Sequence, residues 1–186
     1  MAQVTSSGFP RRGLAPVFLL LALSLLPISL SEAADVPLEY GVKATFLLRF
    51  TQFIEWPSEA LGPTDAPFNI CVVGNDPFGA ALDQIVSGET VNGRKVGDPK
   101  MDREPARGLC QIIFVPGQGE SPGWLSGVGR GVLTVGEGES FVRNGGMIGF
   151  VVENRRVTFY INQRNAAAAG LDIRSGLLAV AKSVIR

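Results

Sequence analysis

The sequence predicts an α/β fold: a single three-layer domain with a mostly parallel sheet of about five to six strands, flanked by helices. Three observations favour this fold class. Short, apolar, β-branched runs at Phe68–Val73 and 111–115 are typical of strands covered on both faces. These runs alternate with helical patterns, as in a parallel sheet with crossover connections. Late in the chain, apolar runs at 147–152 and 156–161 flank a polar turn at 153–155, which predicts an antiparallel hairpin.

The first expected helix spans residues 38–55. Its apolar side chains recur at steps of three and four residues, as on one buried helix face, and Pro57 ends it. By default this face packs into the core, and the alternative is that its aromatic side chains line a partner groove or a ligand wall. The apolar positions are Val42, Phe46, Leu47, Phe50, Phe53 and Ile54.

The other elements follow in chain order. Asp76 can cap a helix at 78–87, with Pro77 at its first position. After that helix we expect a weak strand at 90–96 bent at Asn92 and Gly93, a loop with one helical turn at 98–108 and the strand at 111–115. A short helix at 124–128, a strand at 132–135 and a turn of helix at 140–144 lead to the hairpin. The chain then continues with a helix at 163–169 capped by Asn162, an extended segment at 171–173 and a last helix at 175–185.

The N-terminal residues predict a secretory signal peptide at 1–33. Two arginines precede the apolar residues 14–30, and Ser31 and Ala33 are the small residues that the peptidase needs. Cleavage after Ala33 would leave one domain, 34–186, in the periplasm, with no direct membrane insertion. The alternative is an uncleaved membrane anchor, but the apolar run is short for a span and contains two prolines.

The composition argues against several classes of function. The chain has 186 residues, with Lys+Arg 17, Asp+Glu 17 and His 0. A balanced charge argues against a nucleic-acid partner, because phosphate neutralisation needs an excess of basic residues. Without histidine there is no Ser-His-Asp or Cys-His pair and no His-ligated zinc. We therefore expect no metal, no cofactor and no enzymatic activity.

The two cysteines, Cys71 and Cys110, lie inside one expected strand and directly before another. In an exported chain, two lone cysteines usually pair. If the two strands are neighbours, about 5 Å apart, the cysteines come within bridging distance in a staggered register. The disulfide would close a loop of about 40 residues, worth about 4 kcal/mol in the chain-entropy model. Two buried free thiols are the alternative, and no Cys-x-x-Cys motif supports a catalytic pair.

Other motifs carry little chemistry. Residues 74–79 lack the Gly-x-Gly-x-x-Gly spacing and a following Lys-Ser/Thr, and Asp76 would oppose a bound phosphate. Gly145 and Gly146 are interpreted as the sharp start of a strand rather than a phosphate cradle. No two acids are spaced for acid–base work. The arginines are surface residues by default, but a cluster could read a carboxylate or a phosphate; its members would be Arg49, Arg155, Arg156, Arg164 and Arg174.

Several stretches, taken in order, are together more specific than any one of them. They are Glu39-Tyr40-x-Val42-Lys43-Ala44-x-Phe46-Leu47, Phe53-Ile54-Glu55-Trp56-Pro57, Ile70-Cys71-Val72-Val73-Gly74 followed by Asp76-Pro77-Phe78-Gly79, Cys110 with 111–115, 132–136, 145–151 and 157–162. This ordered set, which covers nearly all of the mature chain, resembles the YfiR family of YfiR/HmsC-like periplasmic proteins.

The resemblance implies a periplasmic α/β regulator that often dimerises. Members of this kind repress an inner-membrane diguanylate cyclase by binding its periplasmic sensor domain, which lowers cyclic di-GMP, exopolysaccharide and biofilm formation. Cys71 and Cys110 match the family's paired positions for a disulfide. A second disulfide found in some members, near 145–147, has no cysteines here, so the single bridge is either structural or a redox switch.

We therefore expect a diguanylate cyclase inhibitor, with a periplasmic small-ligand-binding module as the alternative. In the alternative, the aromatic helix and arginines would wall a pocket at the carboxyl ends of the strands. The candidate partner surface consists of exposed residues of the first helix and the hairpin tip. The residues that we single out for partner or ligand binding are Lys43, Arg49, Trp56, Glu153, Asn154, Arg155 and Arg174.

Overall fold

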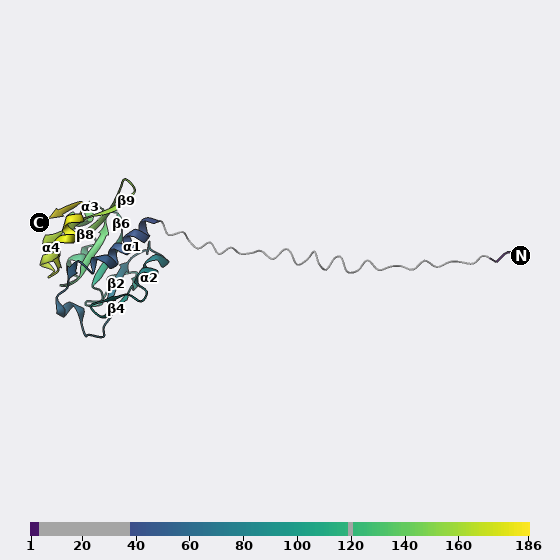
Figure 1. Cartoon of the computed structure of the whole chain (residues 1–186), viewed down its shortest axis with the longest axis horizontal. Helices are drawn as coiled ribbons and strands as arrows, with labels where there is room; N and C mark the ends of the chain where they lie inside the picture. The colour runs from purple at the N-terminus through teal and green to yellow at the C-terminus, as the bar shows by residue number, and fades with distance from the viewer. Residues whose placement is uncertain (4–37, 119–120) are drawn as a thin grey trace. The chain divides into compact units, whose positions relative to one another are not determined.

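The computed structural model describes residues 1–3, 38–118 and 121–186 (Figure 1). Apart from residues 1–3, the predicted signal peptide lies outside the described residues. From residue 38 onward the chain forms a mixed α/β domain in which helices flank a central sheet, as the sequence predicts. The helices are α1 (Leu38–Phe50), α2 (Ala80–Val86), α3 (Gly138–Arg143), α4 (Gln163–Ala168) and α5 (Ser175–Val180), with short 3-10 helices η1 (Ser58–Leu61) and η2 (Gly123–Gly127).

Within the described residues, the central sheet has nine strands in the order β11-β9-β8-β7-β6-β2-β4-β3, with β5 also paired to β2. The strands β2, β6, β7 and β8 run parallel, and β9 runs antiparallel to β8. Their bounds are β2 (Phe68–Val73), β3 (Thr90–Val91), β4 (Arg94–Gly97), β5 (Lys100–Met101), β6 (Ile112–Gln118), β7 (Leu133–Glu137), β8 (Ile148–Glu153), β9 (Arg156–Asn162) and β11 (Ser183–Ile185). A separate pair joins β1 (Ile54–Glu55) to β10 (Asp172–Ile173).

The mostly parallel sheet and the late hairpin are confirmed, but the strands outnumber the five or six predicted. Four of them, β3, β4, β5 and β11, are two to four residues long. Of these, β3 and β4 lie at the weak strand expected at 90–96, whereas β5 and β11 are too short for residue periodicity to reveal. The predicted bend at Asn92 and Gly93 is the turn of the β3–β4 pair, where both residues have positive φ, 52° and 77°.

Alternating side chains of the central strands form two different faces. On the first, which we call the aromatic face, Ile70 and Phe114 belong to one large cluster that also contains side chains of α1, α2 and α4. On the second, the disulfide face, Cys71 and Ile113 pack with Val132 in a much smaller cluster. Because side chains alternate between the two faces along β2 and β6, both faces of the sheet are apolar. Helices cover both faces, so the domain has three layers.

The disulfide joins Cys71 to Cys110, with their Cα atoms 5.8 Å apart. Both side chains are buried. The predicted disulfide is therefore confirmed, and the alternative of two free thiols is wrong. The parallel-strand partner of Cys71 is Ile113, not Cys110. The predicted stagger is thus present: the bridge runs from mid-β2 to the residues that lead into β6.

Glycines allow α3 to lie close against the disulfide face. A Cβ atom added to Gly136 would come within 2.5 Å of the Phe141 ring, and one added to Gly146 would overlap the same ring. A Cβ on Gly149 would overlap the backbone at Gly138. These three glycines, one in β7, one just before β8 and one in β8, therefore serve a close approach of helix and sheet. The positive φ of Gly145, 107°, agrees with the interpretation of a sharp strand start.

Four element predictions need correction. The helix expected at 38–55 ends at Phe50, because Ile54 and Glu55 pair with β10 instead. The helix expected at 175–185 ends at Val180, because Ser183–Ile185 adds a parallel strand to β9. In both places an apolar run fits a helix face and a short buried strand equally well.

The third and fourth corrections concern the chain after β2. Asp76 does not cap a helix: its side chain accepts a hydrogen bond from the Phe78 amide at 2.8 Å, and α2 begins only at Ala80, so Pro77 is not its first residue. The loop expected at 98–108 contains β5, whose two residues pair with β2.

Candidate functional site

An apolar groove lies between the N-terminal half of α1 and the outer part of the β8–β9 hairpin. Its volume is about 590 Å³. Leu38 is 86% exposed and Val152 is 46% exposed, both high for large apolar side chains. The lining residues are Leu38, Glu39, Val42, Phe46, Val152, Arg155, Arg156 and Val157. The first helix and the hairpin are also the two elements that we predicted from the sequence as the candidate partner surface.

The hairpin turn places two arginines beside this groove. Asn154 and Arg155 both have positive φ, 49° and 60°, as the central residues of a two-residue turn of type I′ require. Figure 1 shows the hairpin reaching beyond the neighbouring elements. Among the described residues, Arg155 and Arg156 form no ion pair, so two uncompensated positive charges border the apolar surface.

Unlike the two arginines, Glu153 at the end of β8 has a charged partner, Lys182. The hydrogen bonds of Lys182 to Glu153 and to Tyr160 raise the pKa of Lys182 to about 12. The Lys182 Nζ atom also lies 4.9 Å from the centre of the Tyr160 ring. Glu153 therefore ties the hairpin to the C-terminal segment rather than offering a free carboxylate.

Lys43 is buried, and the expectation that it is exposed on the first helix is wrong. Its side chain is 3% exposed and contacts the carboxylates of Glu39 and Glu137. Its Nζ atom lies 4.4 Å from the centre of the Tyr40 ring. Burial lowers the pKa of Lys43, but hydrogen bonds and charge attraction from the two glutamates outweigh it, so the pKa is raised overall.

Glu137 occupies the carboxyl end of β7 and is 8% exposed. One oxygen binds Lys43, and the other accepts a hydrogen bond from the Gly117 amide at 3.1 Å. The ion pair thus joins α1 to the ends of the parallel strands β6 and β7. It lies next to the groove, because Glu39, the other partner of Lys43, lines the groove. The sequence did not single out Glu137 among its scattered acids. A possible signal was its position directly after an apolar strand and before a glycine.

A second pocket brings together two other predicted residues, Trp56 and Arg174. Its volume is about 480 Å³. Trp56 is buried and donates its ring N–H to the Gln111 carbonyl at 3.3 Å, while Arg174 pairs with Glu55 at 2.8 Å. The lining residues are Thr51, Gln52, Ile54, Glu55, Trp56, Val91, Asn92 and Arg174.

The five arginines considered as one anion-binding cluster are divided among separate places. Arg155 and Arg156 line the groove, and Arg174 lines the second pocket. Arg164 donates to the C-terminal Arg186 carbonyl at 2.6 Å, and Arg49 donates to the Gln52 side chain at 3.2 Å. They therefore do not act together on one anion.

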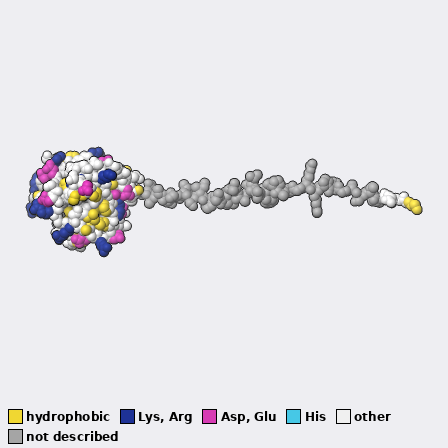
Figure 2. All heavy atoms as spheres, turned by 90° about the horizontal axis from the view of Figure 1, so that it is seen from below, with side chains coloured by type: hydrophobic (Ala, Val, Ile, Leu, Met, Phe, Trp, Pro, Cys, Tyr) yellow, Lys and Arg dark blue, Asp and Glu magenta, His cyan; other side chains and the backbone are white. Residues whose placement is uncertain are grey.

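One face of the domain carries both apolar and charged side chains. Figure 2 shows apolar side chains gathered near the middle of one face, with Lys, Arg, Asp and Glu side chains around them. No helix in the described part of the chain is long and apolar enough to cross a membrane.

The sequence matches a known protein family. A family model described as YfiR/HmsC-like matches residues 40–182, which is most of the chain. The matched span contains both cysteines, Lys43, Glu137 and the whole β8–β9 hairpin. No curated protein matches the sequence.

Proposed function

The chain belongs to the YfiR/HmsC-like family, and we propose that it is a periplasmic, non-enzymatic regulator that represses an inner-membrane diguanylate cyclase. It would do so by binding the cyclase's periplasmic sensor domain. Less cyclic di-GMP would then be made, and exopolysaccharide and biofilm output would fall.

The observation that carries this proposal within the family is the groove between α1 and the hairpin. Large apolar side chains that stay exposed beside a polar rim are characteristic of surfaces that bind proteins. Val152 and Val157 are cross-strand partners, so the hairpin side of the groove is held in place by the sheet. The unpaired Arg155 and Arg156 would favour a partner segment that carries a carboxylate next to apolar residues.

The test is recovery of a cyclase by the tagged mature protein from detergent-solubilised membranes. Val152→Asp places a carboxylate in the apolar groove and should reduce recovery at least about tenfold, because burying it on binding is costly and it competes with the partner for Arg155 and Arg156. Val180→Asp is the matched control, since Val180 is also apolar and exposed but lies outside the groove.

Two results would contradict the proposal. One is recovery of no cyclase together with unchanged cyclic di-GMP on deletion of the gene. The other is equal recovery by both valine variants, which would place the interface elsewhere. A second copy of this chain is another occupant that an apolar groove could accept, and light scattering of Val152→Asp against wild type separates a homodimer from a cyclase complex.

The second candidate function is binding of a small ligand in the pocket beside Trp56. The specific observation is that Trp56 and Arg174, both singled out from sequence, line one pocket of about 480 Å³, a usual size for small-molecule sites. Thermal-shift screening of metabolites tests it. Stabilisation that disappears in Arg174→Gln would support this function, and the absence of stabilisation by any metabolite would count against it.

A further inference from the structure

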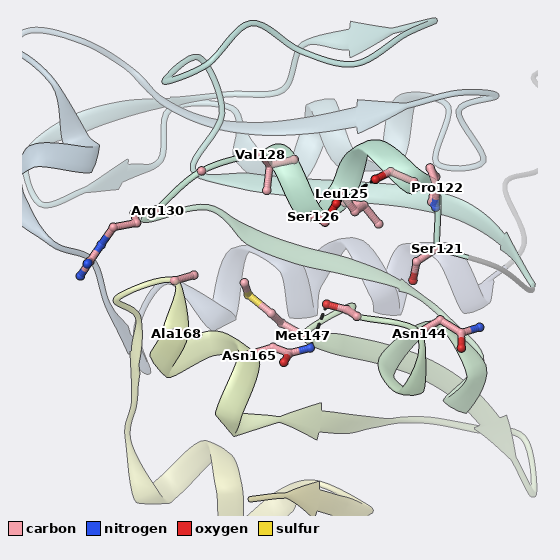
Figure 3. A pocket seen from close by; sticks show the side chains of 14 residues that line it. Ser121, Pro122, Leu125, Ser126, Val128, Arg130, Asn144, Met147, Asn165 and Ala168 are labelled. Atoms are coloured by element: carbon pink, nitrogen blue, oxygen red, sulfur yellow. Dashed lines mark hydrogen bonds between the residues drawn. The ribbon is translucent and has the colours of Figure 1, made fainter.

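A third cavity, of about 620 Å³, lies between η2, the residues leading into β8, and α4 (Figure 3). It shares no residue with the groove or with the Trp56 pocket. Its lining residues are Ser121, Pro122, Gly123, Leu125, Ser126, Val128, Gly129, Arg130, Asn144, Gly145, Met147, Asn165, Ala168 and Ala169. These residues come from three separate segments, 121–130, 144–147 and 165–169, so the cavity exists only in the folded domain.

The middle of the cavity is apolar. Figure 3 shows Leu125 and Val128 on one side and Met147 and Ala168 on the other. Leu125 and Met147 are buried, whereas Ala168 is exposed on the last turn of α4. Such a floor favours the apolar body of a ligand over a fully hydrated ion.

Most polar groups in the wall already have partners. The hydroxyls of Ser121 and Ser126 donate to the carbonyls of Phe141 and Gly123 at 2.9 Å and 3.0 Å. The side-chain amide of Asn165 donates a hydrogen bond to the Gly145 carbonyl at 2.9 Å, which holds α4 to the residues before β8. The serine oxygens and the remaining Asn165 oxygen are thus mainly acceptors, which would not attract an anion by themselves.

The remaining donors lie at the two ends of the cavity. Figure 3 shows Arg130 at one end and Asn144 at the other. Within the described residues, neither side chain has a hydrogen-bond or ion-pair partner. The Arg130 guanidinium rests against the backbone of Gly170, where an added Cβ atom would lie 3.0 Å from Nη2. In this position the guanidinium points away from Leu125 and Met147 (Figure 3). No ion pair within the described residues prevents the long side chain from turning toward a ligand.

The charge of the lining is one-sided. Of the residues around the cavity, Arg130 is positive and none is Asp or Glu. An anionic group is therefore favoured at the Arg130 end. A guanidinium presents two parallel N–H groups, which match the two oxygens of a carboxylate.

We propose that this cavity binds a small apolar monocarboxylate, with its carboxylate at Arg130 and its ring or chain between Leu125 and Met147. This site is additional to the proposed cyclase-binding groove and does not depend on it. It also differs from the Trp56 pocket in its walls and in its cation, which allows the two pockets to be separated by mutation.

The first experiment fills the cavity. Phenylacetate, 4-phenylbutyrate and octanoate are titrated into the mature protein, and binding is followed by protein-observed NMR. Ala168→Phe places a ring at the cavity wall and should weaken the best-binding probe at least about tenfold, or about 1.4 kcal/mol. Ala167→Phe is the matched control, because Ala167 is equally exposed on α4 but does not line the cavity.

The second experiment tests the charge. Arg130→Gln should remove the preference for phenylacetate over its neutral amide, phenylacetamide, whereas Arg174→Gln in the other pocket should leave that preference intact. The proposal is overturned if none of the three acids binds, if Ala168→Phe and Ala167→Phe bind equally well, or if Arg174→Gln rather than Arg130→Gln removes the preference. A cooperative unfolding transition in each variant verifies that loss of binding is not loss of fold.

Discussion

The aromatic face and the disulfide face of the sheet are held together by different means. On the aromatic face, one continuous cluster extends from Phe68 in β2 to Ile161 in β9 and includes the interior of α1. On the disulfide face, the buried residues divide into two clusters, one around Cys71 and one around Phe141. On the aromatic face, apolar packing alone is extensive. On the disulfide face, where the buried clusters are small, a covalent bond joins β2 to the residues before β6.

This difference indicates a division of tasks. A continuous core of interlocked rings fixes the positions of α1 and of the strands, which in turn position the groove. The thinner layers on the other face leave space, and η2, which takes part in covering that face, also forms a wall of the cavity near Arg130. A face that is less completely filled is also one where small molecules can enter without disturbing the core.

The largest loss of stability should follow from removing one ring from the aromatic face. Phe150 is 1% exposed, and its ring lies near those of Phe46, Phe50, Phe114 and Phe159. Phe150→Ala should lower the free energy of unfolding by about 5 kcal/mol, at the upper end for such a change, because the surrounding rings cannot all collapse into the space. Urea unfolding measures the loss.

The matched change on the other face is Trp124→Ala. Trp124 is only partly buried and packs at the edge of both small clusters. Its removal should cost about 2 kcal/mol, since part of the ring is already in water. Equal losses for the two variants would show that the faces do not differ in the way described.

Removing the disulfide should have the next largest effect. The sequence separation of 39 between the two cysteines corresponds, in the chain-entropy model, to about 4 kcal/mol of stability. Cys71→Ala combined with Cys110→Ala should therefore lower the urea midpoint strongly, and reduced wild-type protein should behave alike. Pull-down with oxidised and reduced protein then tells whether the bridge also controls partner binding or only stability.

A result below about 1 kcal/mol would contradict this account of the disulfide face. It would mean that the small clusters suffice to cover the face without a covalent link. Reduced wild-type protein is the control for packing, because the double alanine variant also removes two buried sulfur atoms.

The buried ion pair gives the third prediction. Lys43→Met keeps the length of the side chain but leaves the buried Glu137 carboxylate without its cation, so we expect a loss of about 3 kcal/mol in urea unfolding. Glu39→Gln, which removes the more exposed partner of the same lysine, should cost less than about 1 kcal/mol. A similar cost for both would indicate that Glu137 is not the principal partner of Lys43.

The sequence predicted best where the pattern was long or the local chemistry specific. The strand at Phe68–Val73 has the expected bounds, and Asn162 caps α4 by accepting a hydrogen bond from the Asn165 amide at 3.0 Å. The cap depends on an interaction across three residues, and the strand is recognisable from an uninterrupted run of six buried residues. The pairing of Cys71 with Cys110 was also predictable, because a predicted export signal and a count of two cysteines leave few alternatives.

The misses share a physical cause, which is that burial depends on distant parts of the chain. Ile54 fits the stripe of a helix, yet it pairs with Ile173, more than a hundred residues away. Lys43 would be exposed on an isolated helix, but Glu137 from the end of β7 makes its burial favourable. The two lining elements of the groove were predicted as a surface, whereas the cavity beside Arg130 was not, because its walls come from three segments that are far apart in the sequence.

The smallest predicted effect concerns alkaline pH and tests the charge cluster on the aromatic side. Burial, together with the negative charge of Glu137, raises the pKa of Tyr40 above 10.0. A group whose pKa is raised in the folded state contributes stability that is present below the unfolded pKa and is lost as the pH rises. The raised pKa of Lys43 acts in the same direction above 10.5, so the free energy of unfolding should fall as the pH rises from about 10.

Tyr40→Phe removes the hydroxyl but keeps the ring, so the fall in the free energy of unfolding between about pH 10 and pH 11 should be shallower than in wild type. Urea unfolding at a series of pH values measures that slope. Wild type is the reference, because Lys182, whose pKa is also raised, is present in both proteins and contributes equally to the two slopes. Tyr40→Phe should lose the slope only in part, since Lys43 remains; a slope identical to that of wild type would mean that Tyr40 is not linked to the buried glutamate.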